Sequence, residues 1–581
     1  MTFSQLLQSL ITDTLDVSIP AFFPELALCG TIVLMLLVRV FDWSRWINCT
    51  YVALAGSVAA LVLAAPWRHL SAGAADPHLG TPIFTGMLVY DALSVYFRSL
   101  LLFFAAIFVV FTRISGIPDR EDSADFYTLV LGGTLGMCLM ASANHLLMVF
   151  LAVEMASVPS FVLAGMLKGR RQSSEAALKY AVFGAGTAGV MLYGISLLAG
   201  VLGTAHLPTL AVQLAHVVSD SATFGDRYMV LALGGLMVMV GLAFKLSAVP
   251  FHFWCPDVFE GASAEVNAFL SVSSKAAALA LLVRVALGVG YVKQSDLERR
   301  DIARSAASAP ADRHIDSSTT RVSPVPKGDT APVMLVSAQV STASSDREKL
   351  LDALGPVRSY VCALVALVAA ITCTFGNLAA YGQTNIKRLM AYSTIAHAGY
   401  LMMPVAAAIQ LAGDNATAAE QAVSALCFYV GVYLFMNLGA FAVVAFLRNS
   451  MRSEEIADYA GLIQRCPFMV VCLSVIMLSL LGLPPLAGFV AKFTVFASLV
   501  DAQLWALLIV GGLNTVVSLF YYVRVVKVMA LDPEPEDRLP VAFPPLAALY
   551  VAAVTIPVVA MGVWWNELNR WAEAAAASLL S

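Results

Sequence analysis

The stretch GLAFKLSAVPFHFWCPDVFEGASAEVNAFLSVSSKAAALALLVR at residues 241–284 decides how this chain folds. Two apolar helices meet in it, and each carries one lysine where lipid or protein interior is expected, Lys245 and Lys275. Between them, Pro250 and Pro256 interrupt the helical pattern. A lysine ammonium group at the depth of the bilayer is energetically costly unless it is paired or hydrated. A helix that is broken within the membrane needs protein or water beside its freed backbone groups. The two features together predict a buried polar path inside a membrane protein.

The composition of the whole chain is that of a polytopic helical membrane protein. Of its 581 residues, 60% are hydrophobic and only 12% are charged, whereas soluble domains contain about 25% charged residues. Apolar runs of about 20 residues, the length that crosses a bilayer, recur along most of the sequence. We therefore expect a lipid bilayer around this chain and no nucleic acid bound to it.

About fourteen segments have the length of a membrane span. They are predicted near 19–40, 48–66, 88–112, 126–142, 144–167, 174–203, 228–249, 262–290, 358–379, 388–409, 420–447, 467–499, 502–530 and 541–565. The seventh is broken at Pro250 and the twelfth at Pro484 and Pro485, and each carries a lysine beside its break. Paired broken helices are typical of inverted-repeat transporters with a site at mid-membrane. Because the offset between them is five spans, an odd number, we expect two five-helix units that are inverted relative to each other.

These spans divide the chain into five predicted parts. They are three N-terminal spans (1–125), a first five-helix repeat (126–291), a polar segment (292–357), a second five-helix repeat (358–530) and a last span with its tail (531–581). The polar segment is rich in Ser, Ala and Pro with mixed charge, which predicts a solvated, partly disordered loop.

Basic residues follow the odd-numbered spans and predict the orientation of the chain. Arg39 and Arg45 follow the first span, Lys168, Arg170 and Arg171 the fifth, Lys387 and Arg388 the ninth, and Arg448 and Arg452 the eleventh. By the positive-inside rule these loops are cytoplasmic. Both termini and the polar segment are therefore expected on the outer side.

A few ionisable residues lie deep within the predicted spans and are the candidate functional groups. They are Glu154, Lys179, Lys245, Lys275, His397 and Lys492. Burial disfavours a charged ammonium and a nearby carboxylate restores it. A change in the distance between Glu154 and Lys245 would therefore push a proton onto or off Lys275. The alternatives are a static pair for Glu154, an interfacial amino group for Lys179 and a satisfied core histidine for His397.

Other charged residues are predicted to have structural roles. Those nearer helix ends are expected to be anchors: Glu25, Asp91, Arg98 and Arg284. Those of the linker, His252, Asp257 and Glu260, are expected to be hydrogen-bonding groups, since they lack the spacing of metal ligands. The nine cysteines form no CxxC motif or Cys/His cluster, which argues against an iron–sulfur or zinc site. We expect no metal and no bound cofactor in this chain.

The longest motifs carry a resemblance to a known family. FKLSAVPFHFWCPDVFEGA at 244–262, followed by VNAFLSVSSKAAALALLVRV at 266–285, resembles the core of the antiporter-like membrane subunits of proton-pumping NADH:quinone oxidoreductase, respiratory complex I. NLAAYGQTNIKRLMAYSTIAHAGYLMM at 377–403 and LLGLPPLAGFVAKF at 480–493 are similar to the same family. The wording PDVFEGA and AFLSVSSKAA is most similar to its subunit N branch.

The resemblance implies an all-α subunit of fourteen transmembrane helices with two inverted five-helix repeats, each with a broken helix. It implies that the proton-translocation residues of the family are matched here by Glu154, Lys245, Lys275 and Lys492. Lys179 would match a further family lysine, and His397 could bridge the two half-channels.

The implied function is a proton-translocating subunit of a multi-subunit oxidoreductase in the cell inner membrane. It would couple electron transfer in partner subunits to proton pumping through the buried Glu/Lys/His axis. Flavin, iron–sulfur clusters and quinone would belong to those partners, among which are neighbouring antiporter-like subunits, and no redox centre would lie in this chain.

Two features depart from the family pattern. GASAEV at 261–266 stands where the family usually has a proline-containing stretch, which adds Glu265 near the start of the eighth span. The insertion at 292–357 is longer than the usual connector. Other readings are a subunit of a multisubunit sodium/proton antiporter, a subunit of a membrane hydrogenase or ferredoxin-dependent relative, and a purely structural subunit. The wording of the eighth span argues against the antiporter.

Overall fold

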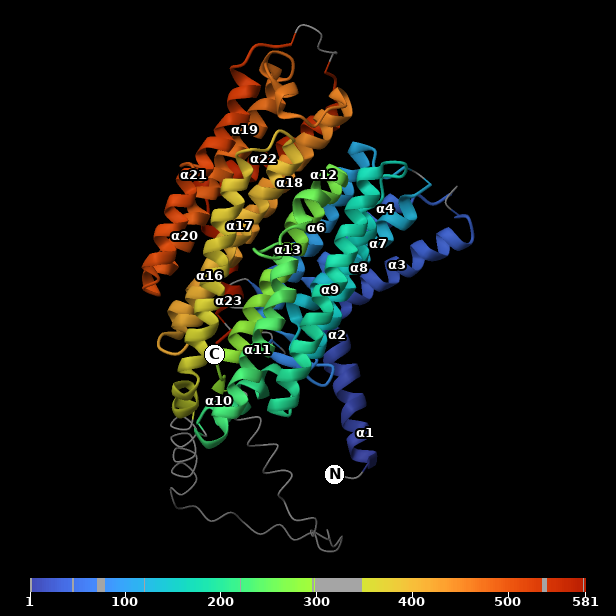
Figure 1. Cartoon of the computed structure of the whole chain (residues 1–581). Coiled ribbons are helices and arrows are strands. Elements are labelled where there is room, and N and C mark those ends of the chain that lie inside the picture. The colour runs from blue at the N-terminus through green and yellow to red at the C-terminus, as the bar shows by residue number, and fades with distance from the viewer. Residues whose placement is uncertain are drawn as a thin grey trace, which may run out of the picture.

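The fold is a bundle of α-helices with one short two-stranded sheet, shown in Figure 1. The computed structural model describes residues 3–43, 46–70, 79–119, 121–219, 221–294, 297, 347–535, 541–577 and 579–580. Over these residues, 13 helices are long and apolar enough to cross a membrane. The predicted all-α membrane fold is confirmed, while most of the predicted polar loop at 292–357 lies outside the described residues.

The N-terminal part surrounds one side of the bundle. It contains α1 (Phe3–Thr12), a π-helix (Asp13–Ser18), α2 (Ile19–Ala21), α3 (Phe23–Val40), α4 (Cys49–Ala64), α5 (Pro66–His69), β1 (Thr81–Ile83), β2 (Leu88–Tyr90) and α6 (Ala92–Ser115). The strands pair antiparallel, with Thr81 opposite Tyr90. Asp91 begins α6 through a capping box, because its carboxylate accepts from the Ser94 N–H at 2.8 Å and its own N–H donates to the Ser94 hydroxyl at 3.0 Å.

The middle part holds the first broken span. Its helices are α7 (Ser123–Ser142), α8 (Leu146–Ala164), α9 (Arg171–Leu202), α10 (Leu207–Ser219), α11 (Ser221–Leu246), α12 (Trp254–Gly261) and α13 (Ala264–Gly290). The break between α11 and α12 contains Pro250, as predicted. Pro256 does not contribute to the break: it lies in the first turn of α12, where proline is tolerated because that N–H has no intrahelical partner.

The C-terminal part holds the second broken span. Its helices are α16 (Gly355–Ala380), α17 (Ile386–Leu411), α18 (Ala416–Met451), α19 (Pro467–Leu481), α20 (Ala487–Asp501), α21 (Trp505–Ala530), α22 (Pro545–Val563) and α23 (Asn566–Ala576), with 3₁₀ turns at Ile456–Tyr459 and Leu462–Gln464. At 15 residues each, α19 and α20 are too short to cross a bilayer alone. Together, with Pro484 and Pro485 between them, they form the predicted twelfth span and complete the fourteen.

The two broken spans run in opposite directions along the bundle. In Figure 1, α11 lies low and leads up to α12, whereas α19 lies high and α20 lies below it. This is the arrangement expected of inverted units.

The predicted basic loops gather at one end of the bundle. Lys168, after α8, pairs with Asp122 at 2.8 Å, and Arg39, near the end of α3, pairs with Asp125 at 3.1 Å. Asn385, before α17, forms a β-bridge with Glu455, which follows α18. Arg45 lies outside the described residues. This clustering agrees with the alternation used to predict orientation, and the side on which the termini lie stays a prediction.

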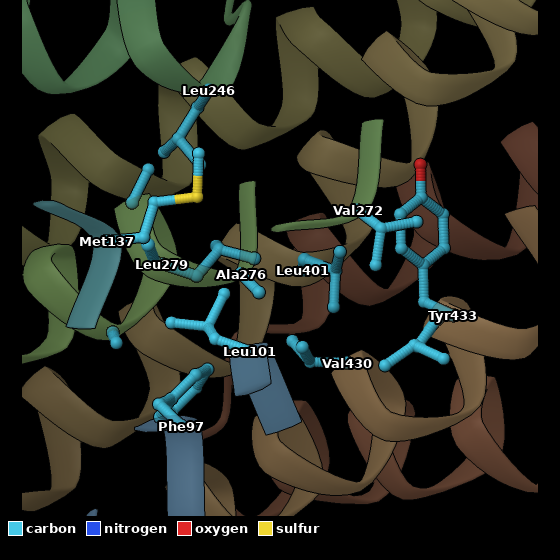
Figure 2. Packing of buried hydrophobic residues seen from close by; sticks show 14 of the residues in the cluster. Phe97, Leu101, Met137, Leu246, Val272, Ala276, Leu279, Leu401, Val430 and Tyr433 are labelled. Carbon is cyan, nitrogen blue, oxygen red and sulfur yellow. The ribbon is translucent and has the colours of Figure 1, made fainter. Parts of the chain in front are cut away.

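Three helices form the enclosed centre of the molecule. Of the most apolar windows, 83% of α13, 89% of α17 and 94% of α18 is buried, against 33% of α9 and of α21. Figure 2 shows side chains from α6, α13, α17 and α18 meeting in one core, among them Leu101, Ala276, Leu401 and Val430. Because α13 and α17 are enclosed by protein rather than lipid, they are where polar groups can be held at membrane depth.

Candidate functional site

Lys275 connects α13 to α17. Only 1% of its surface is exposed, and its Nζ donates a hydrogen bond to the carbonyl oxygen of Thr394 at 2.9 Å. The Thr394 hydroxyl in turn donates to the carbonyl of Met390 at 2.7 Å. The amino group of Lys275 therefore lies at the contact between the two units that contain the broken spans.

His397 follows Thr394 on α17 and is held by two phenols. Its Nδ1 is 2.8 Å from the Tyr429 hydroxyl of α18, and its Nε2 is 3.1 Å from the Tyr522 hydroxyl of α21. Because a neutral imidazole has one donor and one acceptor nitrogen, and each phenol can donate or accept, either tautomer satisfies both contacts. The charges of Lys275 and Lys492 both act on this ring.

Lys492, on α20, is held by the break in its own span. Its Nζ donates to the carbonyl of Leu481 at 2.9 Å, and Leu481 is the last residue of α19, where carbonyl groups lack intrahelical partners. The same Nζ lies 4.5 Å from the centre of the Tyr400 ring, a cation–π geometry. Tyr400 follows His397 on α17, so the contacts of Lys275, His397 and Lys492 succeed one another along this helix.

Lys245 and Glu154 lie apart from that series of contacts. Lys245 stands at the end of α11, is 1% exposed, and its Nζ has no hydrogen-bond partner in the described part of the chain. Glu154, partly buried on α8, is the carboxylate whose charge acts on Lys245. No ion pair within 4 Å joins them in the described ranges, so this structure shows the two groups separated.

Lys179 belongs to an ion-pair network at the basic end. It pairs with Glu175 at 2.8 Å and with Asp257 at 2.6 Å, and its side chain is 37% exposed. Arg388 pairs with Asp257 at 3.2 Å and with Glu260 at 2.5 Å. The interfacial alternative for Lys179 fits this geometry, and the predicted hydrogen-bonding role of Asp257 and Glu260 is confirmed, because they hold α9, α12 and α17 together.

The predicted anchors form two buried ion pairs. Arg98 of α6 pairs with Glu25 of α3 at 2.8 Å, and Arg284 of α13 pairs with Asp91 at 2.6 Å. All four residues are less than a tenth exposed. The first pair joins two N-terminal helices and the second joins the start of α6 to α13 of the enclosed centre, which agrees with the predicted anchoring role.

Several polar groups of the site were missed in the sequence. Tyr400 was detectable, since it lies one turn from His397 and aromatic rings accept cations. Tyr429 and Tyr522 carry no local signal, because they reach His397 from other helices. Lys387, interpreted above as a cytoplasmic basic residue, is 1% exposed and donates to the Glu260 and Ala262 carbonyls at 2.8 and 2.9 Å.

The described ranges contain no candidate metal-binding site. No group of three or more His, Cys, Asp or Glu side chains suited to a metal ion occurs among those residues. No disulfide joins any of the nine cysteines, all of which lie in the described part of the chain.

The fold and the buried lysines define a class: a polytopic helical cation translocator with two broken spans. The family described as NADH:quinone oxidoreductase/Mrp antiporter, transmembrane part, matches residues 143–295 and 347–518. Subunit N of NADH-quinone oxidoreductase from an Anaeromyxobacter species is 36% identical over 564 residues, covering 95% of each chain. Subunit N 2 from Sorangium cellulosum is 36% identical over 498 residues, covering 84% of each chain. The chain belongs to this family and to its subunit N branch.

Solved structures agree with this assignment. A chain of respiratory complex I from Thermus thermophilus with bound aureothin is 29% identical, with a TM-score of 0.65 over 94% of this chain and 98% of that chain. A chain of the Mrp complex from a Dietzia species reaches a TM-score of 0.71 at 18% identity, over 97% of this chain and 98% of that chain. At this identity, the second similarity shows the fold alone. The fold is therefore common to chains of both complexes, and it is the sequence relatives that assign this chain to the subunit N branch.

Proposed function

We propose that this chain is a proton-translocating membrane subunit of NADH:quinone oxidoreductase. One observation carries the proposal: α17 holds three buried polar groups one after another, namely the Thr394 carbonyl that binds Lys275, the His397 ring, and the Tyr400 ring that faces Lys492. Polar groups at membrane depth are costly and usually mark ion or proton pathways. The residues proposed to carry protons are Glu154, Lys245, Lys275 and Lys492, with His397 as a relay and Lys179 as a possible further relay.

The transfer step follows from the donors and acceptors present. A proton taken up from the basic end loads the Lys275 amine, which then gives up a proton through water towards His397. The imidazole accepts on one nitrogen and releases from the other, with Tyr429 and Tyr522 as its hydrogen-bond partners. Lys492 receives the proton and releases it towards the opposite end.

The pair Glu154 and Lys245 acts as the gate. When Glu154 approaches Lys245, the ammonium form of Lys245 is stabilised, and its charge then disfavours a second charge on Lys275. Opposite charges at 4 Å in an effective dielectric of 20 attract by about 4 kcal/mol. Because about 1.4 kcal/mol changes an equilibrium tenfold, the approach of Glu154 is enough to change whether Lys245 carries a proton.

The predicted organisation gives this path its context. The path would lie between two repeats at 126–291 and 358–530, flanked by the helices of 1–125 and 531–581. Lys275 would be loaded from the cytoplasm, and both termini would lie on the outer side of the cell inner membrane. Flavin, iron–sulfur clusters and quinone would be carried by partner subunits, with neighbouring antiporter-like subunits beside this chain.

Purification of the tagged chain in mild detergent tests the assignment. We expect flavin absorbance and iron–sulfur signals that appear on addition of NADH, because the redox centres would co-elute in partner subunits. Signals that respond to hydrogen or reduced ferredoxin, but not to NADH, would assign the chain to a related complex. A colourless assembly of membrane subunits alone would favour the sodium/proton antiporter and overturn the proposal.

A further inference from the structure

Glu265 is a buried carboxylate that the path described above does not use. It lies in the first turn of α13 and is 1% exposed. Neither of its carboxylate oxygens has a hydrogen-bond partner in the described part of the chain. Helix capping does not explain it, because Ser263 fills that role by accepting from the Val266 N–H at 3.3 Å. Burying a carboxylate without donors is costly, and such an exception calls for a functional explanation.

Lys387, a cation whose charge interacts with this carboxylate, is fully engaged with other groups. Lys387 lies within electrostatic reach of Glu265. Its Nζ, however, is held by the carbonyls of Glu260 and Ala262 and by the carboxylate of Glu454, at 2.8, 2.9 and 2.9 Å. Three acceptors use the three donor positions of an ammonium group. The positive charge of Lys387 therefore acts on Glu265, but Lys387 donates no hydrogen bond to it. The two oxygens of the Glu265 carboxylate can accept a proton or bind water.

A polar cavity lies at the basic end of the bundle, next to the residues that hold Lys387. It has a volume of about 630 Å³ and is lined by Glu260, Asn385, Arg448, Glu454 and Glu455, among others. Glu454 both lines the cavity and binds Lys387 at 2.9 Å, so the Glu454–Lys387 pair connects the cavity to the surroundings of Glu265. The cavity lies at the basic end, which is predicted to face the cytoplasm.

Two buried amide groups lie on helices of the enclosed centre. Asn267 donates its Nδ2 to the Phe259 carbonyl at 2.7 Å, but its Oδ1 is unpartnered among the described residues. Asn437 of α18 is fully buried; its amide makes no hydrogen bond of good geometry among the described residues, and the Tyr433 hydroxyl one turn away is the polar group beside it. Such groups are typical sites of buried water. Asn267 and Lys275 lie on the same side of α13, two steps of four residues apart.

Asn437 also faces the centre of the site. It lies one turn from Tyr433, whose ring is 5.3 Å from the His397 ring, and one turn from Phe441, whose ring is 5.9 Å from that of Phe259. It therefore stands on α18 between the His397 region and α12, the helix whose last turn contains Glu260 of the cavity lining.

We propose that Glu265 collects protons for this chain and passes them to Lys275 along a hydrated path beside Asn267 and Asn437. A hydronium ion that enters from the cavity past the Glu454–Lys387 pair gives a proton to the Glu265 carboxylate, which becomes a neutral carboxyl while the hydronium ion becomes water. The carboxyl then gives that proton through water to the unprotonated Lys275 amine, which becomes an ammonium and regenerates the carboxylate. This proposal rests on the proposed function, since it needs Lys275 to be a proton carrier.

The decisive variant is Glu265→Gln. It keeps the shape of the side chain, but its amide does not take up and release a proton near neutral pH as a carboxylate can. In the intact complex in membrane vesicles, we expect NADH-driven proton uptake to fall about tenfold. The difference between Glu265→Gln and wild type should grow as the pH rises. Protons are then scarcer, and the variant lacks the carboxylate that would collect them. Glu265→Asp should retain most of the rate. Glu567→Gln is the control, because it removes a carboxylate of α23 that is 78% exposed and does not line the cavity, and it should leave uptake unchanged.

A second variant covers the case in which Glu265→Gln fails to assemble. Asn437→Leu keeps the branching of the side chain at Cγ but makes the inner path apolar, and it should slow proton uptake to a similar extent with Glu265 in place. Wild-type uptake in either assembled variant would overturn the inference. Lys275→Ala, measured in parallel, distinguishes failure of the proposed function from failure of this inference. If Lys275→Ala pumps normally, the proposed function itself fails. If Lys275→Ala loses proton uptake while Glu265→Gln keeps it, only the role of Glu265 is removed.

Discussion

The two broken spans hold their lysines in opposite ways. Lys492 is bound by the Leu481 carbonyl that the break releases and by the Tyr400 ring. Lys245 ends up beside its break without a hydrogen-bond partner in the described residues, and the charge of one partly buried carboxylate, Glu154, acts on it. A lysine that follows its break can use the freed carbonyls, whereas one that precedes it cannot. The first lysine therefore depends on the charge of a side chain from another helix, and the second on the dipoles of a carbonyl and a ring.

The backbone of the two breaks differs in the same sense. The second break turns at Gly482, with φ 92°, while the first turns at Ser247, with φ 56°. Glycine adopts positive φ without steric cost, whereas a residue with a Cβ pays about 1–2 kcal/mol there. The first break is thus the more strained of the two, which suits a gate, and the second is the more relaxed, which suits a fixed site.

The largest expected effect comes from removing the group between the two sites. Lys275→Ala leaves both breaks intact but deletes the amine that bonds Thr394 across the units. We expect both NADH-driven proton uptake and coupled quinone reduction to fall by about tenfold or more, because a positioned proton carrier typically contributes at least that factor. Both rates are measured on membrane vesicles.

An exposed lysine serves as the control for that variant. Lys168→Ala removes an ammonium whose side chain is 75% exposed at the basic end, and it should leave both rates unchanged. If Lys275→Ala also left them unchanged, the two broken spans would not act as one path.

The gate is tested by a double-mutant cycle. Glu154→Gln should lower proton uptake severalfold, because it removes the one carboxylate whose charge acts on Lys245. Adding Lys245→Met should cost little more, since residues that act as a unit are not additive. Adding Lys492→Met instead should multiply the loss, because Lys492 has its own partners. Equal coupling energies in the two cycles would show that the first lysine is no more dependent on Glu154 than the second.

A glycine tests the relaxed break. In Gly482→Ala the new Cβ would sit at positive φ and 3.0 Å from the Cδ atom of Lys492. We expect a loss of about 1–2 kcal/mol in stability and a lower rate of proton uptake as Lys492 is displaced. Gly512→Ala is the control, because its helical Cβ would meet nothing within 4 Å. A melting temperature of Gly482→Ala equal to that of Gly512→Ala would contradict the assigned role of this glycine.

The spans could be predicted from the sequence, but the contacts between them could not. An apolar run such as 358–379 is a local property, and α16 follows it closely at Gly355–Ala380. Lys275 and Thr394, in contrast, are 119 residues apart in sequence, and no local pattern relates them. The sequence predicts Lys387 as a charged loop residue. Its acceptors are the carbonyls of Glu260 and Ala262 at the end of α12, far away in the sequence, so no local pattern reveals them. The lysines themselves were detectable because a charge in an apolar run is conspicuous.

The smallest effect should come from the ring that faces Lys492. A cation over an aromatic face gains about 0.5–2 kcal/mol, so Tyr400→Leu should slow proton uptake by a few-fold, with the Leu481 carbonyl still holding the ammonium. Tyr400→Phe keeps the ring but loses the hydroxyl contact with Thr515 at 3.0 Å, and it should stay near the wild-type rate. If Tyr400→Phe were as slow as Tyr400→Leu, the hydroxyl rather than the ring would matter. The second lysine would then depend on a proton-exchanging partner, as the first depends on Glu154, and the contrast between the two breaks would disappear.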